Sequence, residues 1–84
     1  MELELTQRFL RSYRRLTNEE KRRVDAHLLL LAQNLRHPSL MARKWGTSAI
    51  WYARVSRDIR IFFEILEDSY LLLDVGHHDI ERGH

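Results

Sequence analysis

The sequence has no cysteine, one proline and three glycines among its 84 residues. Without cysteine there is no disulfide framework, no thiolate nucleophile and no zinc site with cysteine ligands. No apolar run reaches the roughly 18 residues that a membrane span needs, so we expect no membrane partner. The start of the chain lacks the basic and apolar regions of a signal peptide, and we therefore expect a cytoplasmic location.

The rest of the composition is that of a small folded protein. Hydrophobic residues make up 44% of the chain, which favours one modest core, and we expect residues 1–84 to form a single domain. The 14 basic residues exceed the 12 acidic ones too slightly to indicate nucleic-acid binding by themselves. Their placement is more informative, because five basic residues and a single acid, Asp58, lie between Arg43 and Arg60.

The first half of the chain has the pattern of a short strand followed by two helices. Residues 1–5 alternate between Leu and Glu after the initial Met, which predicts a short edge strand. Thr6 is expected to cap a first helix. Thr17 and Glu20 have the capping-box spacing that begins a second helix, which should end near residue 35. A group of arginines shares one face of the first helix, where we expect a solvated surface: Arg8, Arg11 and Arg15.

The second half contains three runs rich in β-branched and aromatic residues, namely 51–56, 59–66 and 70–78. Short polar breaks separate these runs, which is typical of antiparallel strands joined by hairpins. A three-residue first loop keeps the apolar residues on one face and pairs Trp51 with Phe63. The same reasoning predicts the pairs between the second and third runs: Ile65 with Leu71, Phe63 with Leu73, Ile61 with Val75 and Arg60 with Gly76.

These elements predict an α+β fold, with a two-helix hairpin packed on one face of a twisted antiparallel sheet of about four strands. Residues 40–45 should lead into the strand that precedes the three runs. The helices would cover the apolar face of the sheet. The opposite face would then be open to a ligand or a partner.

The predicted register places Arg54 directly opposite Arg60 on the open face. Two arginines in this position repel each other, and a phosphate between them would remove the penalty. Gly76, His77 and His78 follow at the end of the neighbouring run, so we predict one concave basic site from these five residues. The alternative is that both arginines are ordinary solvated residues with surface carboxylate partners.

Several segments together resemble the RelE/ParE superfamily of bacterial and archaeal toxins. These segments are Leu3 to Thr6 before a helix, the helical hairpin, His37-Pro38-Ser39-Leu40, Trp51 to Val55, Ile59 to Ile65, and Leu72 to Ile80. The resemblance implies two helices on a twisted antiparallel sheet. It also implies a metal-independent and cofactor-independent ribonuclease that cleaves mRNA at the ribosome, and a cognate antitoxin that binds the toxin as a hetero-oligomer and blocks it.

Two alternatives accompany that resemblance. ParE-like members share the fold but inhibit DNA gyrase. Many active members carry a catalytic tyrosine shortly after the segment that matches His77 and His78, whereas Glu81 stands near that position here. A toxin that keeps the fold and antitoxin binding without catalysis is therefore the third possibility.

The resemblance and the site prediction together assign roles to particular residues. Arg54 and Arg60 are expected to hold the scissile phosphate. His78 is the preferred general acid or base and His77 the second choice, because histidine titrates near neutral pH. The remaining RNA contacts are expected from basic and aromatic side chains close by: Arg43, Lys44, Tyr52 and Arg57.

Overall fold

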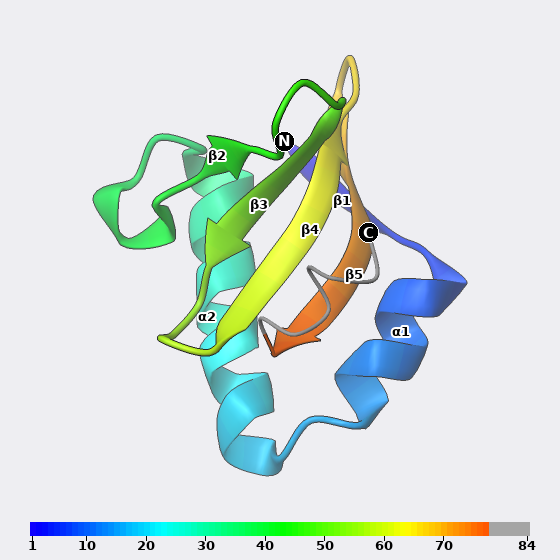
Figure 1. The fold of residues 1–84 in the computed structure, drawn as a ribbon, viewed down its shortest axis with the longest axis vertical. Coiled ribbons are helices and arrows are strands. Elements are labelled where there is room, and N and C mark those ends of the chain that lie inside the picture. The colour runs from blue at the N-terminus through cyan, green and yellow to red at the C-terminus, as the bar shows by residue number, and fades with distance from the viewer. Residues whose placement is uncertain (78–84) are drawn as a thin grey trace.

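The computed structural model describes residues 1–77. Their elements, in chain order, are β1 (Glu2–Leu5), α1 (Gln7–Arg14), α2 (Asn18–Gln33), the 3₁₀ turn η1 (Pro38–Leu40), β2 (Arg43–Lys44), β3 (Ile50–Arg54), β4 (Ile59–Ile65) and β5 (Ser69–His77). Helix α2 runs behind the sheet, and α1 lies beside β5 (Figure 1). Neither helix in this part of the chain is long and apolar enough to cross a bilayer.

The sheet has five strands in the order β1-β5-β4-β3-β2. The α+β architecture, with two helices packed on one sheet, is confirmed, and so is the first strand, at Glu2–Leu5. The sheet has five strands rather than about four, and it is mixed rather than wholly antiparallel, because β1 runs parallel to β5. A parallel pair needs a long connection between its strands, and the chain between β1 and β5 contains both helices and strands β2 to β4.

The register between β3 and β4 is the predicted one. Trp51 pairs with Phe63 and Arg54 pairs with Arg60. The three-residue loop closes with a hydrogen bond from the amide of Val55 to the carbonyl of Ile59, at 2.9 Å. A one-residue slip would have moved the apolar side chains to the open face, so their burial fixes this register.

The register between β4 and β5 is predicted correctly only at one end. The pairs Arg60 with Gly76 and Ile61 with Val75 are confirmed. A β-bulge between Phe62 and Phe63 then shifts the pairing, so that Phe63 pairs with Leu72 and Ile65 with Tyr70, and the predicted partners Leu73 and Leu71 are wrong. The extra residue lets Tyr70 and Leu72 face the core, where they are 5% and 0% exposed.

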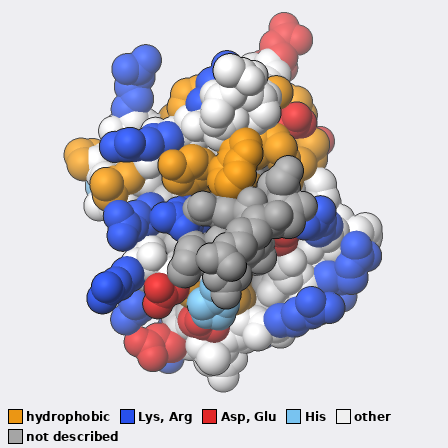
Figure 2. Space-filling view, in the orientation of Figure 1, with side chains coloured by type: hydrophobic (Ala, Val, Ile, Leu, Met, Phe, Trp, Pro, Cys, Tyr) orange, Lys and Arg blue, Asp and Glu red, His pale blue; other side chains and the backbone are white. Residues whose placement is uncertain are grey.

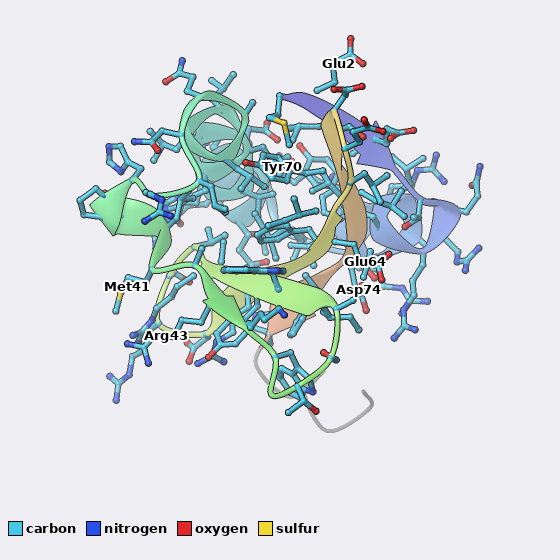
Figure 3. The ribbon with its side chains drawn as sticks, turned by 90° about the horizontal axis from the view of Figure 1, so that it is seen from above. Glu2, Met41, Arg43, Glu64, Tyr70 and Asp74 are labelled. Carbon is cyan, nitrogen blue, oxygen red and sulfur yellow. The ribbon has the colours of Figure 1, made fainter. Side chains whose placement is uncertain are left out.

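The hydrophobic core lies between the sheet and the helices, with contributions from α1, α2 and η1. Its fully buried side chains include Phe9, Val24, Leu31, Leu40, Ile61, Phe63 and Leu72. Figure 3 shows Tyr70 on the α2 side of the sheet and Arg43 towards the opposite side. Among residues 1–77, neither helix lies over the opposite face of the sheet (Figure 1).

Helix α1 lies along the part of β5 that β1 leaves uncovered. Strand β1 pairs only with residues 69–72 of β5. The hydroxyl of Thr6 accepts from the Phe9 amide, as expected of an N-cap, and donates to the Leu72 carbonyl at 2.8 Å. This cap begins α1 next to the second half of β5 and so protects a strand edge that would otherwise be open.

The predicted capping box at the start of α2 is confirmed. The Thr17 hydroxyl accepts from the Glu20 amide at 3.1 Å, and the Glu20 carboxylate accepts from the Thr17 amide at 2.8 Å. Both bonds satisfy amide donors that the first turn of a helix leaves without partners.

Candidate functional site

The open face carries a hollow of about 210 Å³ between β2, β3 and β4, which we call the strand hollow. Its walls are Met41, Arg43, Tyr52, Arg54 and Arg60. Adjacent strands supply these side chains, because Arg43 pairs with Tyr52 and Arg54 pairs with Arg60. The hollow therefore brings together four of the eight residues for which the sequence predicted a role.

Arg54 and Arg60 have the opposed placement that the sequence predicted. Both are half-buried, and Arg60 also pairs on its other side with Gly76, which has no side chain to project over the site. The guanidinium carbon of Arg60 lies 5.7 Å from the centre of the Tyr52 ring, a cation–π contact that orients this arginine. Two positive side chains from directly opposed residues, both lining the same hollow, form a site that favours an anion.

An aromatic cluster lies next to the arginines on the same face. The rings of Trp45, Tyr52 and Phe62 contact one another, with centroids separated by 5.7 to 6.1 Å. Phe62 is completely buried although it points away from the main core. The sequence reasoning assigned no site role to Trp45 or Phe62. Phe62 is two residues from Arg60 along β4, and this spacing places both side chains on the same face of the sheet, so the sequence did contain a signal for Phe62.

His77 does not join the strand hollow. It pairs with Ile59, on the helix-facing side of the sheet, and its Nε2 lies 3.0 Å from Oε2 of Glu20 at the start of α2. Hydrogen bonds from Thr17, together with the charge of His77, lower the pKa of Glu20 below its usual value. His77 thus connects β5 to α2, and the expectation of one site containing both arginines and His77 does not match this placement. His78 and Glu81 lie outside the described residues.

Two other residues with predicted RNA contacts lie at the margin. Lys44 is exposed and pairs with Trp51, so it stands on the opposite side of β2 from Arg43. Arg57 is exposed in the loop between β3 and β4. Neither lines the strand hollow.

The chemistry available in the strand hollow is electrostatic. The guanidinium groups of Arg43 and Arg54 can donate paired hydrogen bonds to phosphate oxygens, and Arg60, whose Nε and Nη1 are buried, adds positive charge to the same hollow. The half-buried ring of Tyr52 can stack on a base. Within residues 1–77, no three side chains of the metal-ligating types gather closely enough to hold a metal ion. The arrangement is suited to holding a nucleotide phosphate and stabilising added negative charge on it.

Comparison with known proteins gives matches in structure. No protein-family model matches the chain, and no curated protein sequence matches it. YafQ from E. coli superimposes with a TM-score of 0.78 at 14% identity, covering 95% of this chain and 96% of that one. The RelB-RelE antitoxin-toxin complex from Methanococcus jannaschii gives 0.78 at 14% identity and covers 95% of each chain. The intact E. coli RelBE toxin-antitoxin complex gives 0.73 at 15% identity, covering 90% of this chain and 94% of that one.

These similarities establish the fold. The chain has the architecture of RelE-like toxins over nearly its whole length, and the resemblance predicted from the sequence is confirmed at that level.

Proposed function

We propose that this protein is the toxin of a toxin–antitoxin pair and acts as a metal-independent endoribonuclease that cleaves mRNA at the ribosome and represses translation. The observation that carries the proposal is the opposed pair Arg54 and Arg60 in a hollow beside Tyr52, on a fold shared with RelE-like toxins. A cytoplasmic location follows from that role.

In the proposed reaction the ribose 2′-hydroxyl attacks the adjacent phosphorus, and the bond from phosphorus to the 5′-oxygen of the next nucleotide breaks. Arg54 and Arg60 hold the phosphate and stabilise the charge that builds on its oxygens. Tyr52 stacks a neighbouring base. His78 takes the hydroxyl proton or protonates the departing oxygen, whereas His77, which is bonded to Glu20 on the other side of the sheet, is no longer assigned this role.

Three further basic residues contribute positive charge along the path of the RNA: Arg43, Lys44 and Arg57. Arg43 lies on the wall of the hollow, whereas Lys44 and Arg57 stand at its margin. Contacts of this kind fix the position of the backbone without reading sequence. The expected protein partner is an antitoxin, since solved relatives of the same fold include toxin–antitoxin complexes.

The test is to incubate the purified protein with ribosomes carrying mRNA, in the presence of a chelator, and to map the new RNA ends. Cleavage should persist in the chelator and should fall about 10²–10³-fold in Arg60→Ala and in Arg54→Ala, because each removes one charge-stabilising group. Arg22→Ala, which changes an exposed residue of α2, is the matched control. Unchanged cleavage in both hollow variants would refute the proposed site.

The gyrase-inhibitor alternative predicts a different result. Such a protein would inhibit DNA supercoiling by purified gyrase and leave the RNA intact. A toxin that has lost catalysis would do neither and would only bind its antitoxin. Running the supercoiling and RNA assays on one preparation distinguishes the three possibilities.

A further inference from the structure

A second basic hollow, of about 430 Å³, lies on α1. We call it the α1 hollow, and its walls are Arg8, Arg11, Ser12, Arg15 and Asp74. The arginines come to one side because their spacing of three and four residues places them on one helix face. Three guanidinium groups against one carboxylate leave a formal charge of +2 in the hollow. The sequence predicted only a solvated surface here.

The carboxylate of Asp74 is committed to the interior. Its side chain is 4% exposed and accepts from Arg8 Nε at 3.0 Å, from the Ser12 hydroxyl at 2.5 Å and from the Val75 amide at 2.9 Å. The Arg8 side chain itself is 57% exposed. Because the bond uses Nε, the terminal nitrogens of Arg8 keep their donors for another acceptor. Asp74 therefore orients Arg8 while offering little negative charge to solvent.

Helix stability explains only part of this arrangement. Arg11 lies in the last turn of α1, where a positive charge interacts favourably with the helix dipole. Arg8 is the second residue of the helix, and a positive charge there is unfavourable. The first turn contains no acidic residue to offset it. The buried carboxylate of Asp74 therefore supplies the counter-charge that the first turn of α1 lacks, while the Arg8 side chain remains 57% exposed.

From this geometry we propose that the α1 hollow binds phosphates of the RNA backbone at a distance from the scissile bond. The inference rests on the proposed function, since it assigns a second contact to the same ligand. Figure 2 shows Lys and Arg side chains along both margins of the open face, over α1 on one side and over β2 and β3 on the other. The longest dimension of the molecule is 31 Å. If successive phosphates of one strand are spaced about 3.4 Å apart along the strand axis, fewer than about ten nucleotides reach from one margin to the other.

The donor set favours a phosphate backbone over an acidic protein segment. All three cations of the hollow are arginines, whose planar fork matches two phosphate oxygens, and Ser12 adds a hydroxyl at the same place. The strand hollow on the opposite margin is also built from arginines. One extended polyanion that contacts both margins accounts for the two hollows together.

The test measures the salt dependence of binding to a short RNA that carries a 2′-deoxy substitution at the cleavage position and stays intact. The variant is Arg11→Gln combined with Arg15→Gln, which leaves the bond between Arg8 and Asp74 in place. The control is Arg14→Gln combined with Arg22→Gln, which removes the same charge from exposed positions outside the hollow.

The loss of two phosphate contacts should reduce the slope of log K against log salt by about 1.4 and weaken binding roughly 25-fold at about 0.1 M salt. The control should keep the wild-type slope. Equal slopes in variant and control would overturn the proposal. A second result would also overturn it: polyglutamate binds the wild type and not the variant, while both proteins bind RNA equally well. The hollow would then serve an acidic protein partner.

The same variants separate this inference from the proposed function. In the cleavage assay the α1 variant should raise KM and keep kcat, whereas Arg60→Ala should lower kcat. If the protein binds RNA with the predicted loss of slope but cleaves none, the second contact stands and the nuclease proposal fails. If kcat falls in the α1 variant with no change in the slope of binding, the second contact fails and the nuclease proposal stands.

Discussion

The opposed arginines of β3 and β4 should make the free protein less stable than it could be. Side chains directly opposite in an antiparallel pair start from Cβ atoms about 5 Å apart. Like charges on directly opposed residues destabilise a sheet by an amount of the order of 0.2–1 kcal/mol. Arg54→Gln, which removes one charge of the pair, should therefore stabilise the fold by about 0.5 kcal/mol and raise Tm by roughly 2–4 °C.

Urea unfolding in a phosphate-free buffer, at low salt and at about 1 M salt, checks this expectation. The gain should be largest at low salt and should almost vanish at about 1 M, where the Debye length is only about 3 Å. Arg57→Gln, in the exposed loop between the two strands, should show no such gain. A variant at Arg54 that is less stable than the wild type at low salt would refute the reasoning.

The same pair predicts a response to inorganic phosphate. A phosphate concentration ten times its dissociation constant should stabilise the wild type by about 1.4 kcal/mol, because the anion binds only the folded site. Arg54→Gln should lose most of this response and, under the proposed function, most of its activity. A more stable and less active variant is the outcome expected where a functional site keeps repulsive charges together.

Further predictions concern the helices and the core. Thr17→Ala removes the cap of α2 and should cost about 1 kcal/mol, which calorimetry would show as a Tm lower by roughly 4–8 °C. Hydrogen bonds from Thr17 lower the pKa of Glu20, so the ionised Glu20 carboxylate stabilises the fold fully above its usual pKa and loses this effect as the pH falls through the lowered value. Urea unfolding between pH 6 and pH 3 should show this loss of stability in the wild type and a smaller loss in Glu20→Gln. The bond to Asp25 raises the pKa of Tyr13, so the stability it provides is present below about pH 10 and is lost above it, and Tyr13→Phe should flatten the alkaline limb of the stability profile. Phe63→Ala should cost about 3–5 kcal/mol in urea unfolding, because the side chain is 0% exposed and the core has no means to refill its volume.

The sequence predicts those parts of the fold where local pattern and burial agree. Between β3 and β4 polar and apolar residues alternate, so only one register keeps Ala53 and Ile61 inside, and that register is observed. In β5 three consecutive leucines, residues 71–73, are apolar in any register. Alternation therefore gives no information about the bulge that decides which of them faces the core.

The candidate site follows the same rule. The pairing of Arg54 with Arg60 was accessible from parity, and so was the placement of His77 on the helix-facing side. The contact of His77 with Glu20 was not accessible, because it joins residues 57 positions apart and depends on how α2 packs. The α1 hollow depends likewise on a packing contact, between Asp74 and Arg8.

The parallel pairing of β1 with β5 sets an order of events during synthesis. Strand β1 is translated first and its partner is the last strand described, and Thr6 bonds to a carbonyl 66 residues further along the chain. The nascent β1 has no template until the ribosome has made almost all of the domain, so closure of the sheet is a late, long-range step that comparatively slow folding should reveal.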